Sequence, residues 1–363
     1  MKETIIAPGA TLGILGGGQL GRMIASAAAR LGLKVHVFND TPASPAFALA
    51  DATTCAPFTD EAALRSFAGS VDVATYEFEN VPREAAALVA GLVPLRPGVG
   101  ALATSQDRLA EKRFIADLGI ATAPFRPVDD AGDLQAALAA IGMPAILKTR
   151  RFGYDGKGQA AIRKAGDADG ALAAMKGAPS ILEGFVDFVC ELSVVAARAP
   201  DGSFAAFDIC ENRHENHILA LTSVPAAVSA ATAQQAREIA HAIAGALDYV
   251  GVFAVELFLT RDAAGAESLV VNEIAPRVHN SGHWTDFGAQ TSQFEQHVRA
   301  VCGWPLGPAG RYGRVAMRNL IGDDVETWQH HLADPQARLT LYGKEEARPG
   351  RKMGHVTLLR DPE

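Results

Sequence analysis

The sequence predicts an α/β protein with α+β character overall, and three observations lead to this. Strand and helix patterns alternate over the first hundred residues, and longer apolar strands follow from about residue 181. Two glycine-rich loops each follow a strand directly. Alternating strands and helices are typical of a parallel sheet with helices on both faces. The chain of 363 residues has room for roughly two or three domains.

The elements of the first part follow from its apolar pattern. Residues 11–16 are an apolar strand that ends in glycines, residues 19–30 have helical spacing, and residues 34–38 and 71–78 are further strands. The stretch 91–102 is rich in glycine and proline and ends this unit. A helix is then expected from about Ser105 to Leu118, with Ser105 as its N-cap.

The rest of the chain divides into three further parts. A compact unit contains the strand 145–150, and the strands 191–198, 251–260 and 267–275 follow with a helix at 230–248 among them. From about residue 310 the pattern indicates short strands and turns. We therefore expect divisions at 1–104, 105–180, 181–309 and 310–363.

Composition excludes several classes of protein. The net charge is −8, and nucleic-acid or anionic-membrane partners favour a basic face instead. Four cysteines without a CxxC spacing indicate free thiols. Apolar runs are too short to span a bilayer, and the N-terminal one is interrupted by proline and glycine. We expect a cytoplasmic protein without a membrane or nucleic-acid partner.

The first glycine loop has a dinucleotide-binding spacing. Gly16, Gly18 and Gly21 lie between a strand and a helix, and Asp40 ends the next strand. Such glycines let a pyrophosphate approach the helix N-terminus, and the acid binds a ribose. A tight turn and a loop for another phosphate are alternatives. Gln19 at the mouth of the loop indicates a ligand.

The second glycine loop follows Lys148, which lies within an apolar strand. Residues 152–159 contain three glycines with Asp155 and Lys157 between them. Such a loop can close over phosphates, although the sequence lacks the pattern of a P-loop. A lysine whose head reaches water and a plain surface turn are the alternatives.

Two carboxylates are predicted to face each other. Glu256 and Glu273 are 17 positions apart, and a hairpin about residues 263–265 brings them opposite. Like charges in this position destabilise a sheet unless a cation lies between them. Magnesium prefers such oxygens, and Asn272 adds another. Neutralisation by a lysine or arginine, and a register shifted by one residue, are the alternatives.

The stretch 276–285 follows the second carboxylate strand and is crowded with polar groups. Five of the seven positions from 277 to 283 are polar: Arg277, His279, Asn280, Ser281 and His283. Arginine can bind a phosphate with two parallel hydrogen bonds. No cysteine is near, and the carboxylates are already assigned, so we interpret this stretch as a substrate site and not as a zinc site.

These motifs resemble one family nearly from end to end. GILGGGQLGRM (13–23), TYEFENVP (75–82), GYDGKGQ (153–159), ENRHENHIL (211–219), NEIAPRVHNSGHWT (272–285) and GKEEARPGRKMGH (343–355) are similar to the 5-(carboxyamino)imidazole ribonucleotide synthases, ATP-grasp enzymes of purine biosynthesis. The resemblance implies a Rossmann-like pre-ATP-grasp domain (1–104), an ATP-grasp small subdomain with a glycine-rich lid (105–180), a large subdomain with the metal site (181–309) and a small β-rich C-terminal domain (310–363).

The resemblance also implies the site residues. Those expected at ATP are Arg108, Lys148, Gly153, Tyr154, Asp155, Gly156, Lys157, Gly158, Gln159, Glu183, Gly184, Phe185, Val186, Glu191, His214, Asn272 and Glu273. Those expected at the ribonucleotide are Gln19, Glu77, Glu79, Tyr154, Asp155, Lys157, Arg277, His279, Asn280, Ser281 and Lys352. Glu256 and Glu273 are expected to hold Mg²⁺, with Mn²⁺ as a substitute.

The reaction implied is ATP-dependent carboxylation of aminoimidazole ribonucleotide with bicarbonate, through carboxyphosphate. The expected catalytic residues are Lys148, Asp155, Lys157 and Arg277, with Asp155 orienting the amine or accepting its proton. The family is usually dimeric, so a homodimer is expected. The rivals are an ATP-grasp ligase for another intermediate, a nicotinamide-dependent oxidoreductase and a non-catalytic nucleotide-binding regulator.

Overall fold

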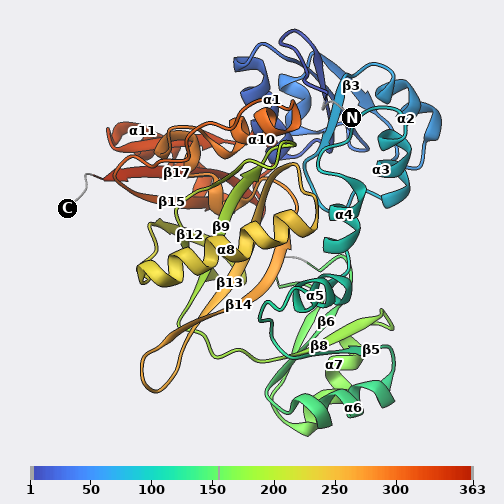
Figure 1. The fold of residues 1–363 in the computed structure, drawn as a ribbon, viewed down its shortest axis with the longest axis vertical. Helices are drawn as coiled ribbons and strands as arrows, with labels where there is room; N and C mark the ends of the chain where they lie inside the picture. The colour runs from blue at the N-terminus through green and yellow to red at the C-terminus, as the bar shows by residue number, and fades with distance from the viewer. Residues whose placement is uncertain (1–3, 154–155, 361–363) are drawn as a thin grey trace.

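The computed structural model describes residues 4–153 and 156–360, which form three sheets and the helices around them (Figure 1). The N-terminal sheet is at the top right in Figure 1, the smallest body lies at the bottom, and the largest sheet fills the middle and left. Among the described residues, no helix is long and apolar enough to cross a membrane.

The N-terminal sheet is parallel, as predicted. Its order is β3 (Ala52–Cys55), β2 (Lys34–Asn39), β1 (Thr11–Leu15) and β4 (Val73–Tyr76). Leu12 and Ile14 pack with helix α1 (Gln19–Arg30) on one face. Leu15 packs on the other face with α2 (Glu61–Ala68) and α3 (Arg83–Ala90). The period of two along β1 therefore gives each face its own core.

The predicted N-cap at Ser105 is wrong. Ser105 ends a separate helix, α4 (Val99–Ser105), and α5 runs from Arg108 to Asp117. Asp107 caps α5, because its Oδ1 accepts hydrogen bonds from the N–H groups of Leu109 (2.9 Å) and Ala110 (3.2 Å). Arg150 also donates to both carboxylate oxygens of Asp107, from Nε to Oδ1 and from Nη2 to Oδ2.

A four-stranded antiparallel sheet forms the smallest body. Its order is β5 (Phe125–Val128), β8 (Ser180–Gly184), β6 (Ala145–Thr149) and β7 (Gln159–Ile162). Helices α6 (Ala131–Ile141) and α7 (Ala168–Ala174) pack on it around Leu134 and Leu147. This body is coloured teal to light green at the bottom of Figure 1.

The largest sheet has nine strands, and its main path follows the order β14-β13-β9-β11-β12-β15-β17-β16. Its strands are β9 (Cys190–Arg198), β10 (Phe204–Ala206), β11 (Cys210–Glu215), β12 (Ile218–Val224), β13 (Gly251–Arg261), β14 (Glu267–Ala275), β15 (Arg314–Ile321), β16 (Ala337–Leu341) and β17 (Lys352–Arg360). The expectation of short strands in the tail is wrong, because β15 and β17 are long and continue this sheet.

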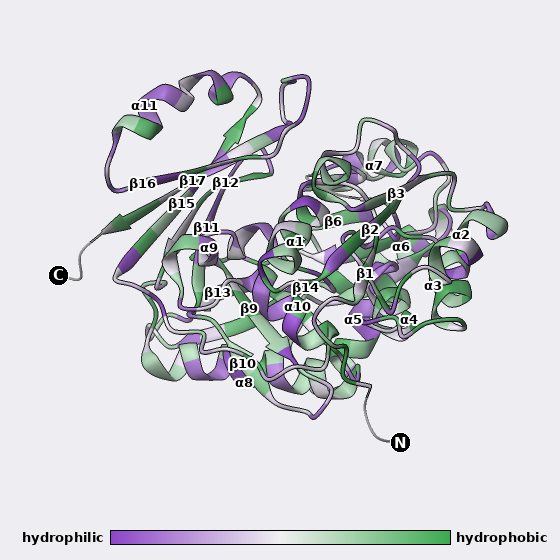
Figure 2. Ribbon diagram, turned by 90° about the horizontal axis from the view of Figure 1, so that it is seen from above, coloured by the Kyte–Doolittle hydropathy of each residue, from purple (hydrophilic) through white to green (hydrophobic). Residues whose placement is uncertain are grey.

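The two faces of the nine-stranded sheet differ. Helix α8 (Ala230–Ala246) covers one face, where Val194, Val255 and Leu257 are fully or almost fully buried. Figure 2 shows this helix beneath strands that are mostly hydrophobic. On the other face, Val252 and Ala254 are buried under α10 (Gln293–Val301), and the next residue on that face is Glu256. This face therefore changes from apolar to polar towards the site.

Helix α10 joins the N-terminal sheet to the nine-stranded sheet through a buried histidine. His297 Nδ1 accepts a hydrogen bond from the Val252 N–H (3.0 Å), and its Nε2 lies 2.8 Å from Thr75 Oγ1. Because Nδ1 accepts, the neutral ring carries its proton on Nε2 and donates to Thr75. Burial lowers the pKa of His297 to about 3.

Candidate functional site

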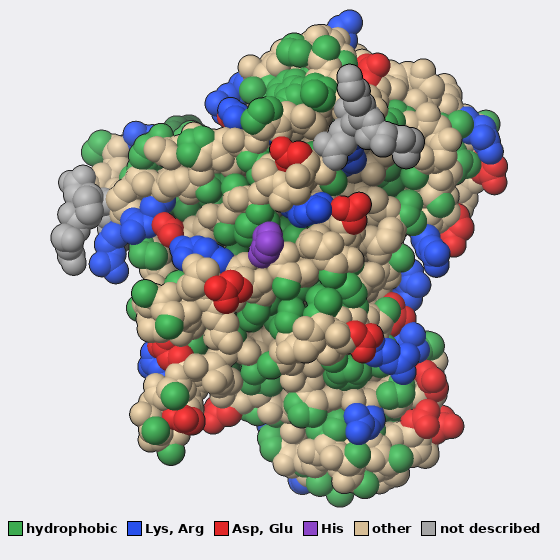
Figure 3. All heavy atoms as spheres, viewed as in Figure 1, with side chains coloured by type: hydrophobic (Ala, Val, Ile, Leu, Met, Phe, Trp, Pro, Cys, Tyr) green, Lys and Arg blue, Asp and Glu red, His purple; other side chains and the backbone are tan. Residues whose placement is uncertain are grey.

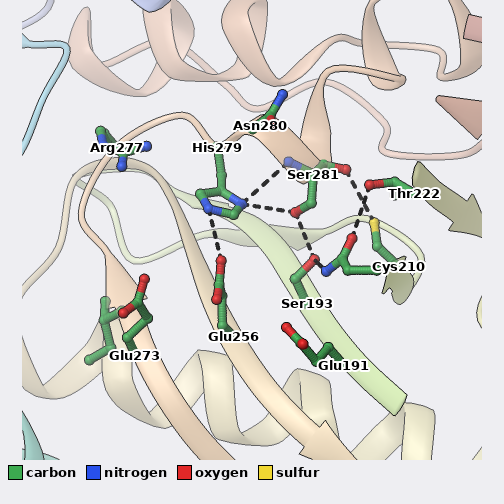
Figure 4. Close-up of polar contacts among 12 residues, drawn as sticks. Glu191, Ser193, Cys210, Thr222, Glu256, Glu273, Arg277, His279, Asn280 and Ser281 are labelled. Atoms are coloured by element: carbon green, nitrogen blue, oxygen red, sulfur yellow. Dashed lines mark hydrogen bonds and ion pairs between the residues drawn. The ribbon is translucent and has the colours of Figure 1, made fainter. Parts of the chain in front are cut away.

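The two predicted metal carboxylates lie directly opposite each other. Glu256 on β13 pairs with Glu273 on β14, and the register shifts at the next position, which leaves Asn272 without a partner strand residue. Figure 4 shows the two side chains side by side. Asn272 Oδ1 is buried and has no hydrogen-bond partner among the described residues. The hairpin geometry is confirmed, and the register-shift alternative is wrong.

Each carboxylate also has a nitrogen donor of another side chain beside it. Arg108 Nη1 lies 2.9 Å from Glu273 Oε2, and His279 Nε2 lies 3.1 Å from Glu256 Oε1. Burial disfavours the charge of Glu256, but the hydrogen bond from His279 outweighs it and lowers the pKa of Glu256 to about 2. The alternative of an arginine that pairs with one of the two carboxylates is thus correct for Glu273.

The lysine of strand β6 faces a glutamate of the neighbouring strand. Lys148 Nζ donates to Glu183 Oε2 on β8 at 2.9 Å, and the two residues are diagonal neighbours on one face of the small sheet. Burial opposes the charge of Glu183, but Lys148 and then Lys112 lower its pKa to about 2. Glu183 Oε1 is buried without a partner in the described chain. The Lys148 head therefore does not simply reach water.

The second glycine loop lies between the small sheet and the large one. Gly153 O accepts a hydrogen bond from Arg108 Nη2 (3.4 Å) and the Thr149 N–H donates to Gly158 O (2.8 Å). A Cβ at Gly156, whose φ is +77°, would lie 2.6 Å from the His217 side chain in the β11–β12 turn. Only glycine fits this close approach without a shift. Tyr154 and Asp155 lie outside the described residues.

A second acid–histidine pair lies on the strands beside Glu256. His214 Nδ1 on β11 is 2.8 Å from Glu191 Oε2 on β9. Burial opposes protonation of His214, but the Glu191 carboxylate beside it outweighs this and raises the pKa of His214. The polar face of the sheet thus runs from Glu273 across β13 and β9 to β11.

The stretch after β14 makes specific contacts with other parts of the chain. Arg277 donates from Nε and Nη2 to both carboxylate oxygens of Glu79, and the resulting ion pair outweighs the effect of burial and lowers the pKa of Glu79 to about 2. Asn280 and Asn319 exchange two hydrogen bonds of 3.0 and 2.8 Å. These contacts connect the N-terminal sheet, this stretch and β15.

A hydrogen-bond chain fixes His279 (Figure 4). His279 Nδ1 lies 2.9 Å from Ser281 Oγ, which lies 2.7 Å from Ser193 Oγ on β9. Asn212 Nδ2 donates to Ser193 Oγ, and Thr222 donates to Asn212 Oδ1. The imidazole is thereby held with its other nitrogen towards Glu256.

The first glycine loop encloses a carboxylate of the protein itself. The N–H groups of Gly18 and Gly21 donate to Glu77 Oε1 (2.9 Å) and Oε2 (3.1 Å), and a Cβ at Gly16 would lie 2.6 Å from the Glu77 side chain. Burial raises the pKa of Glu77. The Glu77 carboxylate takes the position at the helix N-terminus that an anion favours. The dinucleotide interpretation is therefore not supported.

Several residues at the site were missed by sequence reasoning. Lys344 Nζ donates to Lys352 O at 2.7 Å, and burial, followed by repulsion from Arg351, lowers the pKa of Lys344 to about 8. Lys112 and Glu111 of α5 are almost fully buried beside β14. Charged positions usually indicate solvent exposure, so the only available signal was the spacing of these two residues from Arg108.

Charge is mixed over one face of the molecule. On the face in Figure 3, Lys and Arg side chains alternate with Asp and Glu side chains and with uncharged stretches, and a histidine lies near the centre. In the described part of the chain, no group of three or more His, Cys, Asp or Glu is arranged to hold a metal ion. This face thus carries no single extended field of one sign.

Three family models match successive parts of the chain. The ribonucleotide synthetase preATP-grasp domain matches residues 9–106, and the ATP-grasp domain matches residues 113–294. The phosphoribosylaminoimidazole carboxylase C-terminal domain matches residues 315–363. The resemblance found from the motifs therefore extends over the fold.

Individual relatives are similar over almost the whole chain. The N5-carboxyaminoimidazole ribonucleotide synthase of Brucella melitensis is 50% identical over 362 residues, which cover 99% of both chains. The solved synthetase from Thermus thermophilus has a TM-score of 0.90 at 47% identity, with 96% of this chain and 94% of that chain covered.

A further solved structure contains ligands. The synthase from Aspergillus clavatus in complex with ADP and 5-aminoimidazole ribonucleotide has a TM-score of 0.90 at 34% identity, with 98% of this chain and 94% of that chain covered. Sequence, domain order and fold agree from end to end with one group of enzymes, and the chain belongs to the N5-carboxyaminoimidazole ribonucleotide synthase family of ATP-grasp ligases.

Proposed function

We propose that this enzyme uses ATP and bicarbonate to carboxylate the exocyclic amine of 5-aminoimidazole ribonucleotide. The observation that carries the proposal is the alignment of Glu256 with Glu273 across one hairpin, beside Lys148 and the glycine loop. The complex of the Aspergillus clavatus relative with ADP and 5-aminoimidazole ribonucleotide supports the choice of substrates.

In the first step, an oxygen of bicarbonate attacks the γ-phosphorus of ATP, and the bond to the ADP oxygen breaks. Carboxyphosphate and ADP are the products. Lys148 and Arg108 stabilise the negative charge on the phosphate oxygens, because they are cations held in a partly buried site. Closure of residues 153–159 over the phosphates excludes water from the reactive product.

The residues present fit magnesium. Glu256, Glu273 and the unpartnered Asn272 Oδ1 supply hard oxygen donors, which are the ligands that magnesium prefers together with water and phosphate. When bound, the ion neutralises charge on the ATP phosphates. Mn²⁺ has similar ligand preferences and is the proposed substitute.

In the second step, the amine of the ribonucleotide attacks the carboxyl carbon of carboxyphosphate or the CO₂ released from it. A C–N bond forms, phosphate departs and the amine loses a proton, for which Asp155 is the proposed acceptor. Gln19, Glu77, Glu79, Arg277, His279, Asn280, Ser281 and Lys352 are proposed to surround the ribonucleotide. The proposed assembly is a homodimer, and the proposed domain divisions remain 1–104, 105–180, 181–309 and 310–363.

The proposed reaction is tested by ADP release from MgATP. We expect release to require 5-aminoimidazole ribonucleotide and to rise with added bicarbonate. The measurement is a coupled ADP assay, together with incorporation of labelled bicarbonate into an acid-labile product. ADP release that is indifferent to this ribonucleotide would contradict the proposed acceptor and leave the ATP site intact.

Lys352→Ala is expected to raise the KM for 5-aminoimidazole ribonucleotide by about tenfold or more, since one charge-assisted hydrogen bond contributes roughly 1.5–3 kcal/mol. The KM for ATP should change by less than about twofold, which corresponds to roughly 0.4 kcal/mol. The measurement is initial rates with each substrate varied. Arg318→Ala, an exposed residue on the neighbouring strand β15, is the control. A rise in the ATP KM alone would contradict the placement of Lys352.

A further inference from the structure

Helix α5 turns three ionisable side chains towards β14, the strand of Glu273. Arg108, Glu111 and Lys112 are spaced i, i+3 and i+4, so they lie on one side of the helix. Arg108 contacts the Glu273 carboxylate, and the other two contact the backbone of β14. Glu111 and Lys112 are only 2% and 1% exposed. The reaction proposed above uses neither of them.

The contacts with β14 lie on either side of its irregular position. β14 is an edge strand of the nine-stranded sheet, and Asn272 is the residue omitted from its ladder with β13. Lys112 Nζ donates to Val271 O at 3.2 Å, and the Ile274 N–H donates to Glu111 Oε1 at 2.7 Å. Buried backbone groups at a sheet edge require such partners. The helix therefore fixes the backbone that presents Asn272 and Glu273.

Lys112 also reaches the small sheet. Its Nζ lies 3.5 Å from Glu183 Oε2, the same oxygen that accepts from Lys148 at 2.9 Å. One ammonium group thus contacts β14 of the large sheet and β8 of the small sheet. A buried ion pair of this kind adds little net stability compared with apolar packing, so its main consequence is to fix geometry.

We propose that Lys112 is a positioning residue for ATP, because it fixes Glu183, and through it Lys148, relative to the strand of Glu273. This inference rests on the proposed ATP site. Phosphoryl transfer needs Lys148, which is proposed to contact the phosphates, at a fixed distance from the metal carboxylates Glu256 and Glu273. Lys148 belongs to the small sheet and the two carboxylates belong to the large one. A misplacement of about 1 Å can lower a rate by roughly 100-fold.

The test is Lys112→Met, which keeps the length of the side chain and removes its charge and its hydrogen bonds. We expect kcat/KM for ATP to fall by about 100-fold. The KM for 5-aminoimidazole ribonucleotide should stay within about twofold, roughly 0.4 kcal/mol. Lys112→Gln keeps a donor without the charge and is measured as well, so that a folded variant is available if the methionine variant does not fold.

Ile115→Ala is the control for stability. Ile115 is fully buried on the same helix and belongs to the apolar core, so its truncation lowers the melting temperature without moving Glu183. All three variants are assayed below their melting temperatures. Loss of ATP kcat/KM in the Lys112 variants, with Ile115→Ala unaffected, supports positioning. Unchanged ATP constants in the folded Lys112 variants, or an equal loss in Ile115→Ala, would overturn it.

Lys148→Met separates this inference from the function on which it rests. If Lys148→Met retains normal ATP constants, the proposed ATP site is wrong. If Lys148→Met is impaired and the Lys112 variants are not, the ATP site stands and only the positioning role of Lys112 is wrong.

Discussion

Glu273→Gln is expected to lower kcat for ADP formation by about 1,000-fold, roughly 4 kcal/mol of transition-state stabilisation. Glutamine keeps the shape of the side chain and removes one of the two negative charges that Glu256 and Glu273 place opposite each other. With Glu256 as the one carboxylate left and Asn272 Oδ1 as a neutral oxygen, the site loses most of its attraction for a divalent cation. The measurement is kcat as a function of total magnesium concentration. The magnesium concentration that gives half-maximal kcat should be higher for the variant than for the parent chain.

The fold of the Glu273→Gln variant should persist, because Glu273 is partly exposed and makes its only side-chain ion pair with Arg108 in the described part of the chain. Circular dichroism and the melting temperature check this. The matched control is Glu267→Gln, which makes the same substitution at the far end of the same strand. Activity in Glu273→Gln equal to that of the control would refute the metal assignment.

The carboxylate pair was predictable from local sequence. Two long apolar strands flank a short turn containing Gly265, so the hairpin fixes the register, and the register fixes which side chains are opposite. The helix at 19–30 and the parallel order of the first strands were equally accessible, since both follow from periodicity and connection.

Contacts between distant segments were not predictable in this way. Asp107, and not Ser105, caps α5, and Arg150 contributes to that choice from 43 positions along the chain. Likewise, Lys112 appears solvent-facing in sequence because its partners, Val271 and Glu183, come from two different sheets. Periodicity reports the nearest neighbours of a residue, whereas burial of a charge depends on tertiary packing.

The first glycine loop shows how one pattern can serve two purposes. Its spacing fits a dinucleotide, yet the loop amides of Gly18 and Gly21 bind Glu77 from the end of β4. The physics of an anion at a helix N-terminus is the same for a carboxylate and for a phosphate. The spacing predicted close approach of an acceptor group to these amides, and the packing of Glu77 shows that the acceptor is a side chain of the protein itself.

His297→Gln is expected to change the acid dependence of stability. Burial lowers the pKa of His297 to about 3, while the unfolded chain has the ordinary value near 6.5, so the unfolded state binds the extra proton as pH falls. Stability due to this residue is full above pH 6.5 and is lost as pH falls towards 3. Between pH 7.5 and 4.5 the loss is about 2.5 kcal/mol, and the glutamine variant should lack it.

The structural reason is the hydrogen bond at Nδ1. That nitrogen accepts from the Val252 N–H, so a proton added there would face another proton in the interior between the two sheets. The measurement is the free energy of unfolding by urea at several pH values. At pH 7.5 the variant should be less stable than the parent chain, because glutamine cannot reproduce both bonds to Thr75 and Val252.

The test compares the parent chain with His297→Gln, because the titration of other groups in the same pH interval changes the free energy of unfolding in the opposite direction. Burial, and then the nearby Glu273, raise the pKa of Glu111 to about 8, so acidification stabilises the fold through Glu111. That contribution is common to both chains and cancels in the difference. If the His297→Gln curve is instead parallel to that of the parent chain, folding does not change the pKa of His297, and α10 does not make the joint between the two sheets acid-sensitive.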